Sequence, residues 1–218
     1  AMKILDKLGE SDKGLKDKIA GNIVTKEPNV RAVLDKVVTK EVDAGFVYLT
    51  DAYQAKNEVK IIDVPTNISV TPAYPIAVLR ESDSPKLAQS FVDYVTSKEG
   101  IRVLEKYGFA PNIENPKDFS AQSFDDETLI VYAASSMTDA FEEMAKNLKE
   151  VTGADIKFKF ASSGSLAQLI ESGAVGGESG ADVFAAANLA HMKSLQEKKF
   201  AEDYIEFTEN KIVVVVPQ

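Results

Sequence analysis

The sequence predicts an α/β protein whose strands are largely parallel. Segments with the 3.6-residue apolar period of a helix alternate along the chain with short apolar segments that suit strands. The run of valines at 213–216 is continuous rather than alternating, as expected for a strand buried on both faces. Hydrophobic residues make up 44% of the chain, which is typical of a globular protein.

The first half of the chain contains helical segments with clear boundary residues. Gly9 ends the first, and Pro28 and Asn29 precede the apolar positions of the second. Ser84 and Pro85 open a third. The expected helices are 2–9, 28–41, 86–97 and 101–108, and the expected strands are 44–49, 58–64 and 76–80.

A polar stretch at 111–127 interrupts this alternation. It contains proline, asparagine and aspartate without any apolar period, which predicts a linker or a loose surface loop. The chain ends on two strands around the turn Glu209–Asn210. Between the linker and these two strands the expected strands are 128–134, 155–160 and 181–186, and the expected helices are 137–150, 164–173 and 188–198.

The composition excludes several classes of function. A net charge of −9 disfavours a nucleic-acid partner, whose phosphates need a basic surface. The chain has no cysteine, so thiolate metal sites and cysteine nucleophiles are excluded. The single histidine, His191, cannot build a typical zinc site by itself. No apolar run reaches transmembrane length and no signal peptide opens the chain. We therefore expect no metal site and no cofactor.

Two strand-to-helix junctions share the sequence Ala-Ser-Ser. They are 134–136 and 161–163, and each follows an apolar strand and precedes an amphipathic helix. Helix capping alone explains such serines: Asp139 lies three residues after Ser136, as in a capping box, and Ser162 or Ser163 caps the second helix. The repetition favours a second role. Helix N-termini gather at the carboxyl ends of parallel strands, where free N–H groups and hydroxyls can hold an anion.

A serine nucleophile is the alternative chemistry at these junctions. Ser163, Asp182 and His191 occur in the chain order of α/β-hydrolases. The nucleophile elbow of that class requires Gly-x-Ser-x-Gly, whereas Ala161 and Ser165 occupy the two glycine positions here. A serine hydrolase that uses Ser163 therefore remains the second hypothesis, and a non-enzymatic role is the first.

The chain also resembles the molybdate/tungstate-binding proteins of ABC importers. Segments 129–153, 160–174, 181–195 and 210–217 resemble the first half of that family, and segments 29–52, 74–79 and 90–111 resemble its second half. The order of the two halves is reversed in this chain. The resemblance therefore implies a circularly permuted form of the family, or a piece that spans the junction of a tandem repeat.

The resemblance implies a type II periplasmic-binding-protein fold with two lobes, a hinge and a cleft. It implies that Ser136 and Ser163 bind the oxyanion through hydroxyl and amide groups, Val30 through its backbone N–H, and Tyr48 through its phenol. The ligand would be molybdate or tungstate, the location extracytoplasmic (periplasmic or anchored at the cell surface), and the partner the membrane subunit of an ABC permease.

The lobes expected from this order are 1–72, an incomplete second lobe, and 73–218, a first lobe that includes the linker 111–127. Hinge strands are expected near 73–76 and 214–217. The family has a further strand, helix and loop between its counterparts of 210–217 and 2–9, and this central segment is lacking. A buried sheet edge left without it would need a partner. A strand-swapped homo-oligomer, or a fragment that does not bind ligand, is therefore a third hypothesis.

Overall fold

The computed structural model describes all residues from 1 to 218, and they form two compact units. Unit 1 comprises residues 1–71 and 210–218, and unit 2 comprises residues 72–209. The chain therefore passes from one unit to the other at Thr71–Pro72 and again at Glu209–Asn210. The expected division placed 210–218 with the second of these units. The difference arises because the last strand pairs within unit 1.

Unit 1 is built on a three-stranded sheet with the order β1-β9-β2, in which β9 runs antiparallel to both neighbours. Its core consists of valines and leucines from α3 and the strands, among them Leu34, Val37 and Val213. The elements of unit 1 are α1 (Met2–Ser11), α2 (Lys13–Gly21), α3 (Val30–Val38), β1 (Gly45–Tyr48), α4 (Leu49–Gln54), β2 (Val59–Asp63) and β9 (Ile212–Pro217).

Two features of unit 1 differ from the sequence expectation. The first helix continues past Gly9 to Ser11, and a second helix, α2, follows because the side chain of Asp12 accepts a hydrogen bond from the Leu15 N–H and caps it. The expected hinge residues 214–217 lie within β9, which is the central strand of this sheet. They therefore do not mark the passage between the units.

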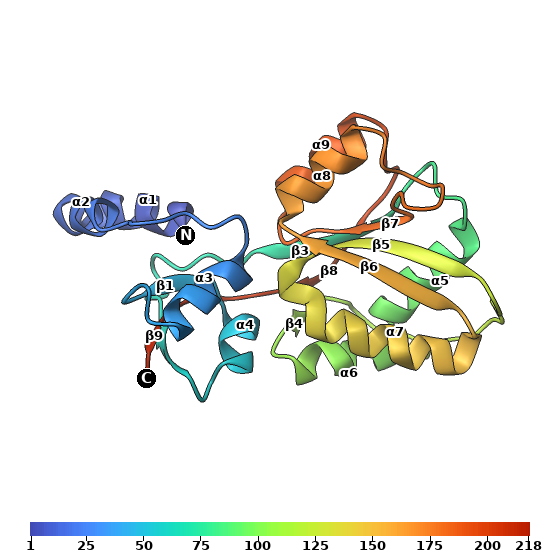
Figure 1. Ribbon diagram of the computed structural model, residues 1–218, viewed down its shortest axis with the longest axis horizontal. Helices are drawn as coiled ribbons and strands as arrows, with labels where there is room; N and C mark the ends of the chain where they lie inside the picture. Colours follow the sequence, from blue (N-terminus) through green and yellow to red (C-terminus); the bar gives the residue numbers. More distant parts are fainter. The chain divides into compact units, whose positions relative to one another are not determined.

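Unit 2 is built on a six-stranded sheet with the order β4-β8-β3-β7-β5-β6. Figure 1 shows α8 and α9 on one face of this sheet and α5, α6 and α7 on the other. The elements of unit 2 are β3 (Ala73–Val78), α5 (Pro85–Thr96), α6 (Lys98–Lys106), β4 (Ala110–Pro111), β5 (Thr128–Ala134), the 3₁₀ turn Ser135–Met137, α7 (Thr138–Thr152), β6 (Asp155–Ala161), α8 (Ser163–Glu171), β7 (Val183–Ala185), α9 (Leu189–Glu197) and β8 (Ile205–Glu209).

The strands of unit 2 are mixed in direction, so the expectation of largely parallel strands is wrong. Only β5 pairs in parallel with its neighbours, β6 and β7. The strand β3 is antiparallel to β7 and β8, and β4 is antiparallel to β8. Strand direction depends on how distant segments pair, and a local apolar pattern carries no information about it.

Both faces of the unit 2 sheet are covered, which explains the largely continuous apolar character of its inner strands β3, β5 and β7. One face carries an aromatic cluster in which the Phe141 ring lies 5.6 Å from Phe91 and 6.1 Å from Phe207, measured between centroids. The other face packs Phe184 against Leu166 and Met192 from α8 and α9. Gly153 ends α7 in the left-handed conformation, with φ of 80°, which favours glycine.

The polar stretch 111–127 is packed against α5 and α6 of the same unit rather than loose. The Lys98 N–H donates to the Lys117 carbonyl at 2.9 Å, and the Phe119 N–H donates to the Glu99 carboxylate at 3.0 Å. The Phe119 ring stands edge-on to Tyr94 at 5.0 Å. Single aromatic residues therefore anchor a segment that has no apolar period.

Candidate functional site

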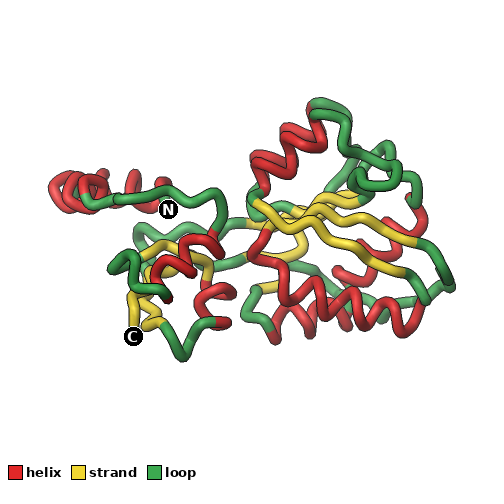
Figure 2. Tube along the Cα trace, viewed as in Figure 1, coloured by secondary structure: helices red, strands yellow, loops and turns green.

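The two Ala-Ser-Ser junctions lie on neighbouring strands of unit 2. The parallel register of β5 and β6 pairs Ala134 with Ala161, so the serines that follow each alanine leave the sheet at the same level. In Figure 2 the yellow strands give way to red helices at this edge of the sheet, where α7 and α8 begin. The two junctions were apparent from the sequence, and the register brings Ser136 and Ser163 to one edge.

Ser163 is the first residue of α8, but it does not cap that helix. The cap is Ser162, whose hydroxyl oxygen accepts a hydrogen bond from the Ser165 N–H at 3.1 Å. The Ser163 hydroxyl oxygen instead accepts from the backbone N–H of Ala187, which follows β7, at 2.9 Å. Ser163 is 5% exposed, so its hydroxyl belongs to the buried part of this edge.

Ser136 has no capping role either. It lies in the 3₁₀ turn before α7, and the cap positions there are Ala134 and Met137, so Ser136 is not the cap residue that the capping-box interpretation expected. Its hydroxyl oxygen lies 2.9 Å from the phenol oxygen of Tyr74, and Ser136 is 4% exposed. Tyr74 was not predicted as a site residue from the sequence. Its only signal was its place in segment 74–79, one of the segments that carry the family resemblance.

The two candidate residues of unit 1 also lie together. Val30 begins α3, and Tyr48 ends β1 and precedes α4. Both line a cavity of about 220 Å³, which Asn29, Phe46 and other residues of the same unit also line. The Asn29 side chain accepts from the Ala32 N–H at 3.1 Å. The N–H of Val30 has no acceptor inside the helix, because it lies in the first turn.

Two charged groups lie near this cavity, and each has an ionic neighbour. Arg31, next to Val30, places its Nε atom 2.6 Å from a carboxylate oxygen of Asp51 in the first turn of α4. Asp51 is fully buried, while the Arg31 side chain is 29% exposed. Glu27 lines the cavity, and one of its carboxylate oxygens lies 3.9 Å from the Lys36 ammonium. The charges at the start of α3 are therefore largely balanced.

The residues of a hydrolase triad do not assemble. Asp182 immediately precedes β7 and accepts hydrogen bonds from the Ser82 hydroxyl at 2.7 Å and the Ile130 N–H at 2.9 Å. It therefore lies at the amino end of the parallel strands, whereas Ser163 follows their carboxyl ends. His191 has its ring beside Gly164: a Cβ atom added there would lie 3.3 Å from the ring. The serine-hydrolase hypothesis lacks an aspartate to orient the histidine.

No group of three or more His, Asp or Glu side chains is arranged to hold a metal ion. No helix has the length and apolar character needed to cross a membrane. The candidate donors at both sites are neutral: hydroxyl groups, a phenol and backbone amides. Such groups can hold an anion by hydrogen bonding, without a base or a nucleophile to react with it.

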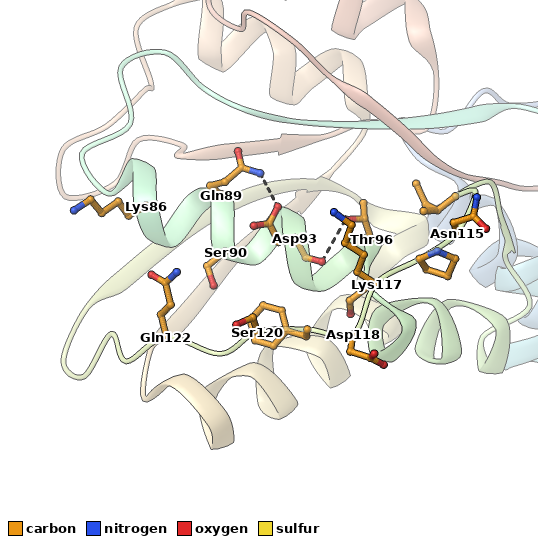
Figure 3. Close-up of a pocket in the computed structure, with 14 residues that line it drawn as sticks. Lys86, Gln89, Ser90, Asp93, Thr96, Asn115, Lys117, Asp118, Ser120 and Gln122 are labelled. Carbon is orange, nitrogen blue, oxygen red and sulfur yellow. Dashed lines mark hydrogen bonds between the residues drawn. The ribbon is translucent and has the colours of Figure 1, made fainter.

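A larger groove than the cavity of unit 1 lies elsewhere, in unit 2. It has a volume of about 730 Å³ and runs between α5 and the segment 113–122, as Figure 3 shows. Its lining mixes Lys86 and Lys117 with Asp93 and Asp118, and the Gln89 amide donates to Asp93 at 2.8 Å. Its volume is greater than that of the cavity in unit 1, but its lining does not bring several hydrogen-bond donors to one point. We therefore place one candidate site at the sheet edge that carries Ser136 and Ser163, and a second at the cavity lined by Val30 and Tyr48.

Comparison with known families gives a match over most of the chain. The family described as bacterial extracellular solute-binding protein matches residues 1–110 and 129–218. The unmatched residues between these two segments belong to the polar stretch that packs along α5 and α6. That description is of a protein that binds a solute, not of an enzyme.

Individual relatives match shorter parts of the chain. The molybdate-binding protein ModA of Mycobacterium tuberculosis is 42% identical over 89 residues, which is 41% of this chain and 34% of that protein. ModA of Escherichia coli is 35% identical over 96 residues, and the putative ABC transporter substrate-binding lipoprotein YvgL of Bacillus subtilis is 41% identical over 94 residues. The matched region spans about a third of the length of these curated relatives.

Among solved structures, the phosphate-binding protein of a phosphate ABC transporter from Streptococcus pneumoniae shares the fold. The TM-score is 0.61 at 16% sequence identity, and the match covers 90% of this chain and 75% of that one. The chain therefore has the α/β architecture of periplasmic binding proteins. At this identity the likeness concerns the fold alone.

Proposed function

Because this chain belongs to the bacterial extracellular solute-binding protein family, we propose that it captures molybdate or tungstate outside the cytoplasm and delivers the anion to the membrane subunit of an ABC permease. The relatives named molybdate-binding protein ModA support the choice of anion. The relative YvgL, a putative ABC transporter substrate-binding lipoprotein, supports the link to an ABC transporter. The protein would bind and release the anion without reacting with it.

The register of β5 and β6 is the observation that supports this proposal most. It places Ser136 and Ser163 at the same edge of the sheet, each at the start of a helical segment. A tetrahedral oxyanion has several oxygen atoms to satisfy, and helix starts supply N–H donors together with a favourable dipole. Neutral donors of this kind also suit a chain whose net charge is −9.

We propose that Val30 and Tyr48 supply a second set of donors for an oxyanion. Val30 would donate its backbone N–H and Tyr48 its phenol. Their shared position around the cavity of about 220 Å³ in unit 1 supports this. Asp51 balances the charge of Arg31 next to them. Hydrogen-bond donors, rather than a net positive charge, would therefore select the ligand.

The test is calorimetric titration with molybdate and tungstate, and with phosphate and sulfate for comparison. Ser163→Ala should weaken molybdate binding about 10-fold or more, because a hydrogen bond to a charged group is worth about 1.5–3 kcal/mol. Ser172→Ala is the matched control. The Ser172 hydroxyl donates to the Gln168 carbonyl at the opposite end of the same helix. The Ser172→Ala variant should therefore bind molybdate as tightly as the wild type.

If the wild-type chain responds to none of the four anions, the proposal fails. If it binds phosphate in preference to molybdate, the anion is wrong while the role of the donors stands. Equal losses in Ser163→Ala and Ser172→Ala would mean that the stability of α8, rather than a contact with the ligand, determines the affinity.

We also propose that the order of the family's halves is permuted in this chain. The family matches as two segments that flank the polar stretch, which supports a join at that place. Sequencing the complete reading frame tests this: the two halves in the usual order, uninterrupted, would contradict it.

Light scattering coupled to size exclusion tests the related proposal of a strand-swapped homo-oligomer, and a monomer at all concentrations would exclude strand exchange.

A further inference from the structure

The hydroxyl group of Tyr74 has an unusual setting. Tyr74 is fully buried at the start of β3, and its ring stands edge-on to Phe109 with 5.5 Å between centroids. Its phenol oxygen lies 2.9 Å from the hydroxyl oxygen of Ser136, 62 residues further along the chain. Burying a phenol hydroxyl costs free energy unless it is hydrogen-bonded. The fold therefore holds this hydroxyl group against one of the two serines of the candidate site.

The pairing of sheet strands explains how Tyr74 reaches Ser136. The antiparallel register of β3 and β7 pairs Ile76 with Ala185, and the Ala186 N–H donates to the Pro75 carbonyl at 2.9 Å. Tyr74 therefore lies beyond the last pair, at the level where the chain leaves β7. The neighbouring strand β5 ends at the same level, two residues before Ser136. Tyr74 is consequently fixed by the sheet itself.

A single proton lies between the two hydroxyl oxygens, and either group can supply it. If Ser136 donates to Tyr74, the proton of Ser136 is already used. If Tyr74 donates to Ser136, the Ser136 proton can point to a ligand. A fully ionised oxyanion only accepts hydrogen bonds, so it favours the second arrangement. In a chain of hydrogen bonds each donor also strengthens the next.

Ser163 already has the corresponding arrangement. Its oxygen accepts from the Ala187 N–H at 2.9 Å, and a backbone N–H can only donate. The Ser163 proton must therefore point elsewhere. Each of the two serines thus has a neighbour inside the protein that can donate a hydrogen bond to its hydroxyl oxygen. For Ser163 the neighbour is an amide, and for Ser136 it is a phenol.

We propose that Tyr74 is a positioning residue that directs the hydroxyl proton of Ser136 toward the bound oxyanion. This role rests on the proposed function. Tyr74 acts through Ser136 and does not touch the ligand. Its phenol donates a hydrogen bond to the Ser136 oxygen on one side and thereby leaves the Ser136 proton for the anion on the other.

The experiment is a double-mutant cycle on the whole chain, titrated with molybdate. Tyr74→Phe keeps the ring and removes the hydroxyl, and it should weaken binding about 3- to 10-fold, as expected for the loss of one supporting hydrogen bond. Ser136→Ala should weaken binding more. The double variant should bind as Ser136→Ala alone, because Tyr74 has no effect without the serine.

Tyr132→Phe is the matched control. It also removes a hydroxyl from a tyrosine that is 2% exposed in unit 2, where the phenol donates to the Ser179 carbonyl at 3.1 Å. It should bind molybdate as tightly as the wild type. Thermal melting without anion then separates the two roles: a similar loss of melting temperature in both variants, with weaker binding only in Tyr74→Phe, supports positioning.

Three outcomes overturn the role of Tyr74. If the wild type binds and Tyr74→Phe binds equally well, the positioning role fails while the proposed function stands. If the effects of Tyr74→Phe and Ser136→Ala simply add, Tyr74 does not act through Ser136. If the wild type binds none of the anions, the proposed function fails and the positioning role fails with it.

Discussion

The two units hold their candidate donors in different ways. In unit 2, Ser136 and Ser163 are buried, and hydrogen bonds to Tyr74 and to the Ala187 N–H fix their oxygens. In unit 1, Val30 and Tyr48 are only partly buried around a cavity in a unit with three strands. The contrast indicates that the donors of unit 2 are set by the sheet, whereas those of unit 1 depend on how the starts of α3 and α4 are held together.

The largest expected effect concerns the separate cores. Phe141 is fully buried among the aromatic rings of unit 2, and Phe141→Ala should cost about 3–5 kcal/mol of its stability. Val37 is fully buried in unit 1, and Val37→Ala should cost about 2 kcal/mol there. Hydrogen exchange followed by mass spectrometry should show faster exchange of β5 in the first variant and of β9 in the second.

The distribution of that exchange decides whether the two units are independently stable. If either substitution speeds exchange equally in β5 and β9, the two cores unfold as one cooperative block. The contrast between the units would then concern the position of their donors and not their stability.

Local pattern predicted the elements around the serines well. The strand 128–134 was predicted with the bounds that the structure gives to β5, because an apolar run between polar residues defines its own ends. The Ala-Ser-Ser junctions were visible for the same reason. Their alignment across β5 and β6 was not, because register depends on the pairing of separate strands.

Interactions between distant residues could not be predicted. Tyr74 is separated from Ser136 by 62 residues, and nothing in its neighbourhood indicates a hydrogen-bonding partner. The same holds for Phe119, whose packing against Tyr94 orders a stretch that lacks any apolar period. The candidate residues Val30 and Tyr48 came from the family resemblance, and periodicity alone would have assigned both to the core.

A second prediction addresses what holds the donors of unit 1. Asp51→Asn leaves Arg31 without its carboxylate neighbour at the start of α3. Removing one partner of a fully buried ion pair costs about 3–5 kcal/mol, and the partial exposure of Arg31 should reduce this to about 2 kcal/mol. Urea unfolding measures the loss.

Asp17→Asn is the control for Asp51→Asn. Asp17 pairs with Lys13 on the surface of α2, where the two side chains are 59% and 82% exposed, so the change should stay below about 0.5 kcal/mol. Equal effects of the two substitutions would contradict the view that the buried pair fixes the helix starts of unit 1.

The smallest expected effect tests Val30 directly, because its contribution should come from the backbone. Val30→Pro removes the N–H, and proline is favoured at the first position of a helix. Asn29 is already extended, with φ of −148° and ψ of 169°, as a residue before proline must be. Val30→Ala instead removes part of the side chain and keeps the N–H. Titration with molybdate should show about 10-fold weaker binding for proline, or about 1.4 kcal/mol, and near wild-type binding for alanine.

The pair of substitutions at Val30 separates three arrangements of unit 1. Weaker binding in the proline variant alone means that the N–H reaches the anion. An equal loss in both means that the packing of Val30 against the core of unit 1 determines the affinity. No loss in either would mean that unit 1 supplies no donor to the anion at this helix.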